Sequence, residues 1–75
     1  MNKDMQFLVE CLSEDIIQML MVDYHYSIDQ AADVLYNSHT YSLLENEKAE
    51  LYYQGAVYVY DMLKQELEKQ NIVNK

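Results

Sequence analysis

The sequence has little of what usually ends helices or crosslinks a chain. It contains no proline, no arginine, one glycine and one cysteine among 75 residues. Without proline there are few points at which a helix must end, and the helix-favouring residues Leu, Met, Glu, Gln, Lys and Ala are abundant. Cys11 has no second cysteine to pair with, which indicates a reducing compartment or a buried thiol. These scarcities predict a helical protein that is not held together by disulfides.

Long apolar runs are absent as well. The most apolar stretch, residues 16–22, is seven residues long and contains Gln18, whereas a membrane-spanning helix needs about 20 residues. The first 15 residues carry acids within their apolar stretch, unlike the uncharged core of a signal peptide. We therefore expect a cytoplasmic protein with no membrane partner.

Positive charge is scarce and unevenly placed. Thirteen acidic residues against five lysines give a net charge of −8. Residues 4–47 contain nine acids and no lysine or arginine, so this segment alone carries −9. Such a surface repels phosphate backbones and anionic lipid headgroups. The charge therefore predicts no nucleic-acid partner and favours a basic or neutral protein.

Periodic apolar residues predict a long first helix and a short second one. The first covers about residues 3–23, and its apolar arc is formed by Met5, Leu8, Val9, Leu12, Ile16, Met19 and Leu20. Residues 24–26 interrupt the pattern. Ser27 followed three positions later by Gln30 is a capping-box signature for a helix over residues 28–36. The buried row of this second helix is expected to be Ile28, Ala31, Ala32 and Leu35.

Two further short helices and a long last helix complete the predicted fold. Ser38 or Thr40 is expected to cap a helix that ends near Leu44, and Asn46 is expected to cap another that reaches residues 51–53. Gly55 divides or kinks the chain before a last helix, whose apolar arc is Ala56, Val59, Tyr60, Leu63 and Leu67. Residues 71–75 are expected to fray. The prediction is one all-α domain over residues 1–75, a compact bundle of four to five helices with long first and last helices and short central ones.

One segment has the spacing of a helix-turn-helix unit. Residues 27–44 combine a capped helix, two small alanines, a polar turn and a second short helix. The second helix offers no Arg or Lys to contact phosphates or guanine edges. We interpret the unit as protein packing and keep a helix-turn-helix transcriptional regulator as the alternative function.

Residues that could support catalysis or metal binding lack the required spacing. His25 and His39 are fourteen residues apart, with Cys11 fourteen before the first, and no pair has the spacing of a helical metal site. Tyr60 and Lys64 match the spacing of short-chain dehydrogenases, but the glycine-rich dinucleotide turn is missing. We therefore predict no enzyme activity, no metal and no cofactor.

Several apolar residues fall outside the predicted core arcs. Eight tyrosines are unusual in a chain of this length, and Tyr58 lies opposite the arc of the last helix with Met62 one turn later. Phe7, Ile17 and Met21 are likewise off the arc of the first helix. Tyr and Met are enriched in contact surfaces, although single exposed apolar residues are common. These five residues are the predicted binding site for a protein partner or for a second copy of the chain in a homodimer.

Three short segments resemble a known family. They are MQFLVECL (5–12), SIDQA (27–31) and LYYQG (51–55), the last followed by Tyr58 and Val59. Together they resemble a family of very short bacterial proteins of unknown function common in gut bacteria, whereas residues 36–50 depart from its pattern. The resemblance implies an all-helical domain, sometimes encoded beside toxin-like genes, and carries over no catalytic residue. We therefore expect a small acidic protein–protein interaction module, antitoxin-like or accessory to the product of a neighbouring gene.

Overall fold

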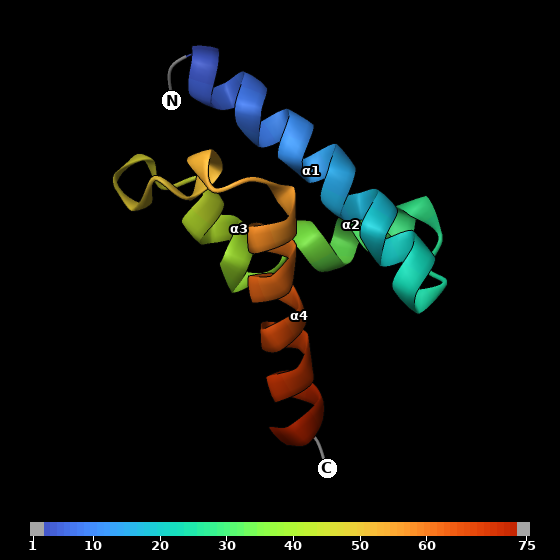
Figure 1. Ribbon diagram of the computed structural model, residues 1–75. Coiled ribbons are helices and arrows are strands. Elements are labelled where there is room, and N and C mark those ends of the chain that lie inside the picture. Colours follow the sequence, from blue (N-terminus) through green and yellow to red (C-terminus); the bar gives the residue numbers. More distant parts are fainter. Residues whose placement is uncertain (1–2, 74–75) are drawn as a thin grey trace.

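Every regular element in the described part of the protein is helical (Figure 1). The computed structural model describes the backbone of residues 3–73 and the side chains of residues 3–70. Its elements are α1 (Lys3–Tyr24), α2 (Ile28–Tyr36), α3 (His39–Leu44), the 3₁₀ turns η1 (Glu47–Ala49) and η2 (Leu51–Tyr53), and α4 (Ala56–Val73). The predicted all-α fold with long first and last helices and short central ones is confirmed. Of residues 71–75, which were predicted to fray, residues 71–73 belong to α4 and residues 74–75 lie outside the described residues.

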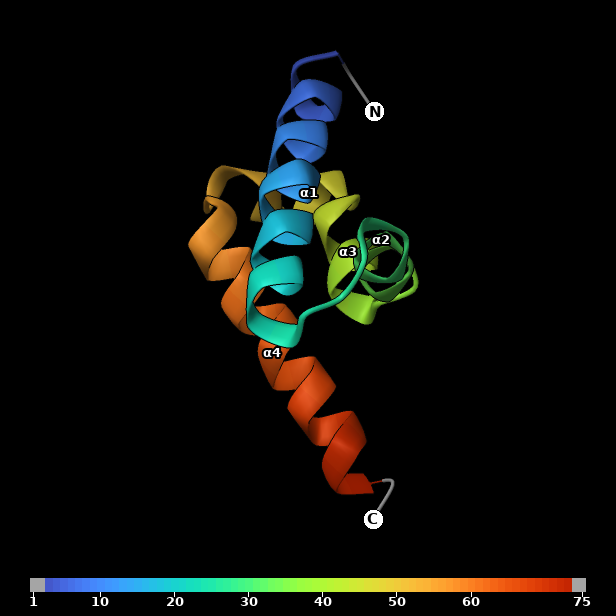
Figure 2. The ribbon, with the colours of Figure 1, turned by 90° about the vertical axis from the view of Figure 1, so that its right-hand side faces the viewer.

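Helix α1 is the central element of the structure. Figure 2 shows α2 and α3 on one side of α1 and the start of α4 on the other, and α1 contacts both α2 and α4. The C-terminal half of α4 extends beyond the other helices, which makes the molecule elongated, with principal dimensions of 40 × 23 × 18 Å. None of the helices in the described part combines the length and apolar character that crossing a lipid bilayer requires.

The predicted apolar arcs form the core. On α1 the residues spaced by three and four are buried, because only this spacing places side chains on one face of a helix. They meet the buried residues of the other elements. The buried apolar residues are Met5, Val9, Leu12, Ile16, Leu20, Ala31, Leu35, Leu44, Leu51, Tyr52, Val59, Tyr60 and Leu63. Leu8 and Met19 of the predicted arc are half-buried and pack against this core.

The capping box predicted for α2 is present. The Gln30 N–H donates to Ser27 Oγ at 3.2 Å, and the Ser27 N–H donates to Gln30 Oε1 at 3.0 Å. Each side chain therefore satisfies one backbone donor that the first helical turn leaves without a partner. The predicted buried row is partly wrong: Ala31 and Leu35 are buried, whereas Ile28 is 62% exposed in the first turn.

The helix predicted to begin at Asn46 does not form. Asn46 does cap, because its side chain accepts from the Lys48 N–H at 2.9 Å, but the turn that it starts is η1, which ends at Ala49. Glu50 then adopts φ 53°, a left-handed conformation that cannot continue a right-handed helix. The chain consequently makes a second 3₁₀ turn, η2, in which Leu51 is buried.

Gly55 separates η2 from α4. Its φ of +89° lies where residues with a Cβ are strained, so the last helix begins as a new element at Ala56. The following residues, Val57 to Tyr60, have high strand propensity but belong to α4, as predicted. No strand occurs anywhere in residues 3–73, so this segment has no strand with which to pair.

A buried tyrosine joins α4 to α1. The Tyr60 hydroxyl donates to the Asp23 carboxylate and lies 3.4 Å from the Met19 carbonyl oxygen. Burial, then the hydrogen bond and charge of Asp23, raise the pKa of the Tyr60 phenol. The Lys64 ammonium lies 5.7 Å from the centre of the Tyr60 ring. The start of α4 is thus fixed to the last two turns of α1.

We expect the backbone at Gly55 and Glu50 to respond in opposite directions to substitution. Gly55→Ala should lower the free energy of unfolding by about 1 kcal/mol through backbone strain alone, since no atom lies within 4 Å of the added Cβ. Glu50→Gly should raise it by about 0.5 kcal/mol, because glycine adopts φ 53° without strain. Urea unfolding followed by circular dichroism measures both. Equal stability of Gly55→Ala and the natural chain would contradict the strain at this position.

Tyr60→Phe should destabilise the fold by about 1 kcal/mol, the usual net contribution of such a hydrogen bond, because it removes the donor to Asp23. Tyr58→Phe is the matched control on the same helix, since the Tyr58 side chain is 54% exposed. Thermal unfolding should separate the two variants by several degrees. If both unfold together with the natural chain, the link between α1 and α4 contributes no stability.

Candidate protein-binding groove

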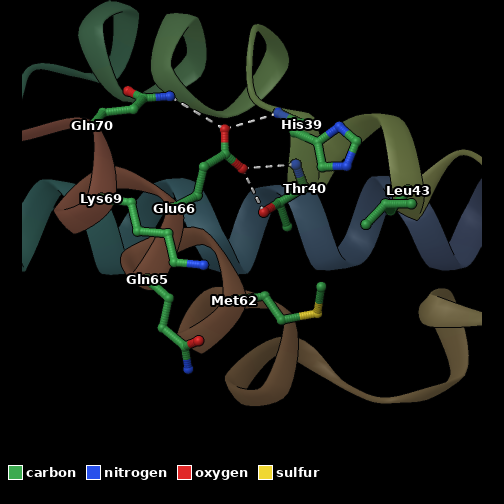
Figure 3. Close-up of a pocket in the computed structure, with 8 residues that line it drawn as sticks. All are labelled: His39, Thr40, Leu43, Met62, Gln65, Glu66, Lys69 and Gln70. Carbon is green, nitrogen blue, oxygen red and sulfur yellow. Dashed lines mark hydrogen bonds between the residues drawn. The ribbon is translucent and has the colours of Figure 1, made fainter. Parts of the chain in front are cut away.

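A groove lies between α3 and the part of α4 that extends beyond the other helices (Figure 3). Its volume is about 570 Å³, within the range typical of ligand pockets. Apolar atoms make up most of its surface, and much of it is open to solvent. The lining residues are His39, Thr40 and Leu43 from α3 and Met62, Gln65, Glu66, Lys69 and Gln70 from α4.

The Glu66 carboxylate holds the two walls of the groove together. One carboxylate oxygen accepts from the His39 N–H at 2.9 Å, and the other accepts from the Thr40 N–H at 2.9 Å and from the Thr40 hydroxyl at 2.8 Å. Gln70 donates a long fourth contact of 3.5 Å. Figure 3 shows the carboxylate pointing from α4 to the first residues of α3.

Glu66 and Ser38 together satisfy the start of α3. Ser38 is the N-cap and accepts from the Tyr41 N–H at 3.0 Å, while Glu66 takes the two preceding N–H groups. A helix of six residues is too short to be stable by itself, so these acceptors matter more than in a long helix. The positive end of the helix dipole also faces the carboxylate.

The environment of Glu66 keeps its carboxylate ionised. Partial burial favours the neutral acid, but the hydrogen bonds from His39 and Thr40 outweigh it, so the pKa of Glu66 lies below its ordinary value. The carboxylate is engaged within the structure, where it accepts hydrogen bonds from the first residues of α3.

Leu43 and Met62 form the apolar part of the groove. They come from α3 and α4, are half-buried, and pack against the core. Tyr58 precedes Met62 by one turn of α4 and is 54% exposed. Residues four apart lie on one face of a helix, so Tyr58 extends this apolar row beyond the groove.

The five predicted partner-binding residues are divided between α4 and α1. Met62 lines the groove, and Tyr58 is exposed on the same helix. The other three belong to α1: Phe7 is 64% exposed, whereas Ile17 and Met21 are half-buried and pack against the core. Met62 is therefore the one member of the set that lines the groove.

Cys11 is exposed on α1, so the prediction of a buried thiol is wrong. It belongs to the same helix as Phe7, one turn later, on the side away from the buried arc.

The helix-turn-helix order is present in α2 and α3. The unit that would enter DNA, α3, has six residues, and its N-terminal N–H groups are occupied by a carboxylate. Recognition helices use this end to approach the bases and phosphates. Glu66 thus places negative charge where DNA binding would require donors.

A second, smaller hollow runs along α1. It has a volume of about 340 Å³ and is lined by Asp15, Gln18, Met19, Val22 and Asp23. The Tyr60 hydrogen bond already occupies Asp23. Within the described residues, no group of three His, Cys, Asp or Glu side chains could hold a metal ion.

No family model, no curated protein and no solved structure matches the chain.

The contact between Glu66 and α3 was not predicted from the sequence. Glu66 precedes Leu67 in a run of charged residues that reads as a solvent-exposed helix end. One signal was present: Ser38 and Thr40 are both candidate caps two residues apart, and only one can be the N-cap. Ser38 takes that role, and the hydroxyl of Thr40 is free to meet Glu66.

Replacing Glu66 should loosen the groove and change the pH dependence of stability. Glu66→Gln puts an N–H₂ donor against a backbone N–H, so it should cost about 1–2 kcal/mol at pH 7. Because the folded pKa is below the ordinary value of 4.5, the stabilisation by Glu66 is present above pH 4.5 and is lost as the pH falls through the folded pKa.

Urea unfolding at pH 7 and at steps below pH 4.5 measures this effect. The difference between the natural chain and Glu66→Gln should shrink as the pH falls. Glu68→Gln is the control, because Glu68 is exposed on the same helix. A difference that does not change with pH would show that the carboxylate charge is not what ties α4 to α3.

Proposed function

We propose that the chain is a small acidic protein–protein interaction module, and that a partner protein docks in the groove between α3 and α4. The observation that carries the proposal is the apolar row formed by Tyr58 and Met62, which leads into a groove completed by Leu43. Methionine and tyrosine adapt to a partner and bury large areas with few lost rotamers. A chain of this size needs most of its apolar side chains for the core. An open apolar groove beside exposed aromatic side chains therefore indicates a contact surface.

The shape of the groove suits an apolar anchor side chain of a partner. Such anchors contribute most when they fill a preformed pocket whose surroundings exclude water. Here Glu66 fixes the position of α3 relative to α4, so the groove exists before the partner arrives. Preformation lowers the entropy lost on binding.

The biological role proposed for this binding is that of an accessory or antitoxin-like protein. It is supported by the resemblance of residues 5–12, 27–31 and 51–55 to the short bacterial family described above. The net charge of −8 also favours a partner that is basic or neutral. A homodimer through the same groove is the second form that this interaction can take.

The alternative, a helix-turn-helix regulator, receives no support from a specific contact in the structure. α3 has no Lys or Arg, and the carboxylate of Glu66 occupies its N-terminus. Binding of the chain to duplex DNA at low salt would nevertheless favour this alternative over the docking proposal.

The test combines affinity capture with variants of the groove. Proteins that copurify with the chain from the cells that produce it are identified, purified and titrated against the chain. Tyr58→Glu with Met62→Glu should weaken binding at least about tenfold, because a charge cannot be buried without a partner. Phe7→Glu is the matched control, since Phe7 is 64% exposed on α1.

The outcomes of this test are distinct. If Phe7→Glu abolishes binding and the α4 variant does not, the partner docks on α1 and the groove proposal is wrong. If the purified chain alone is dimeric by light scattering, and the α4 variant is monomeric, the partner is a second copy. Circular dichroism of each variant establishes that it is folded.

A further inference from the structure

Three large apolar side chains are exposed within six residues, one at the end of η2 and two in the first turn of α4. Tyr53 is 69% exposed, Val57 75% and Tyr58 54%. In the described part of the chain, seven large hydrophobic side chains are exposed, and three of them lie in this one short segment. We name Tyr53, Val57 and Tyr58 the aromatic patch. Exposure concentrated in this way is typical of a contact surface rather than of scattered surface residues.

The aromatic patch is held in place by the backbone and by a buried neighbour. The ring of Tyr53 lies 4.5 Å from that of Tyr52, which is buried in the core. Gly55, with φ +89°, turns the chain between Tyr53 and the first residues of α4. The Tyr53 ring is therefore packed against a buried neighbour, which reduces the freedom that this side chain loses when a partner binds.

Negative charge surrounds the aromatic patch in the sequence. Residues 45–61 contain Glu45, Glu47, Glu50 and Asp61 against the single base Lys48, and all five are exposed. Among the described residues no lysine forms an ion pair with a carboxylate, so no described lysine neutralises the charge of these acids. Aromatic faces and carboxylates together attract cationic side chains.

The described part of the chain contains one cation–aromatic contact. The Lys64 ammonium lies 5.7 Å from the centre of the Tyr60 ring, whose hydroxyl donates to the Asp23 carboxylate. A tyrosine face is thus a site that a lysine of this protein already occupies. Tyr53 and Tyr58 offer the same chemistry to solvent.

From these observations we infer that the partner segment is basic, and that its lysine or arginine side chains lie on the aromatic patch while an apolar neighbour enters the groove. The inference rests on the proposed function. Tyr58 connects the two surfaces, because Met62 follows it by one turn, about 6 Å along α4. A single segment therefore spans both.

The charge at one end of the groove determines where the basic side chains of the segment bind. Glu66 is occupied by α3, so Lys69 is the one lining residue of the groove whose charge is not engaged in the described structure. Lys69 lies on α4 at the end farther from Tyr58. It repels a basic residue there, so the cationic side chains belong at the end of the groove nearest the aromatic patch.

A displayed library of random 16-residue peptides, selected against the full chain, tests the inference. Selected peptides should be enriched in lysine or arginine next to an aliphatic anchor. Titration of synthesised peptides should show that Tyr53→Ser with Tyr58→Ser weakens binding about fivefold or more, whereas Tyr53→Phe with Tyr58→Phe retains it, because the ring face rather than the hydroxyl binds the cation.

Charge variants give an independent readout. Glu47→Gln with Glu50→Gln should weaken binding and reduce its dependence on salt, since fewer carboxylates then attract the peptide. Glu14→Gln with Asp15→Gln is the matched control, because these two acids are exposed on α1. Thermal unfolding of each variant shows that the fold is intact.

Failure of the inference and failure of the proposed function are distinguishable. Peptides that need Leu43 and Met62 but are not basic, and that tolerate Tyr53→Ser with Tyr58→Ser, would overturn the inference and leave the docking groove standing. If the selection yields no peptide whose binding depends on Leu43, Met62 or the aromatic patch, both proposals are wrong.

Discussion

The carboxylate of Glu66 at the N-terminus of α3 is the interaction on which the candidate site depends. It joins two helices whose contact residues are 26 and 27 positions apart, and it accepts three close hydrogen bonds from His39 and Thr40. A six-residue helix does not persist without tertiary support, because its first and last turns leave most backbone groups unsatisfied. The Glu66 carboxylate, together with the burial of Leu44, therefore holds α3 beside α4 and forms the groove.

A second constraint is the balance between a small core and a large negative charge. The core uses one face of α1, and thirteen apolar residues are buried in the described part of the chain. The acids of residues 4–47 have no lysine among them to neutralise their charge, and like charges on two copies of the chain repel each other. Tyr58 is exposed and Met62 is half-buried at the edge of the core, and both lie on a helix that carries lysines as well as acids. This combination favours a partner of opposite charge over a second copy.

Much of the fold follows from local rules, and the departures have physical causes. The capping box at Ser27 and Gln30, and the arcs of α1 and α4, depend on residues three or four apart, so their signals are local. The helix expected after Asn46 failed because Glu50 adopts a left-handed conformation, which no propensity of glutamate indicates. The candidate site was only half predictable, since Tyr58 and Met62 stand out from the helical period. Their relation to Leu43 depends on how α3 packs against α4.

The sequence by itself determined the helical class, the positions of most helix starts, the buried faces of α1 and α4, and the acidic surface. These properties depend on composition and on spacings of three or four residues, which place side chains on the same face of a helix whatever the rest of the fold. Only the tertiary structure decided that Glu66 would cap α3, that Ile17 and Met21 would pack on the core while Phe7 stayed exposed, and that a groove would open beside Met62. Such contacts join residues far apart in the chain, so they are fixed by the packing of whole helices against α1 rather than by any local pattern.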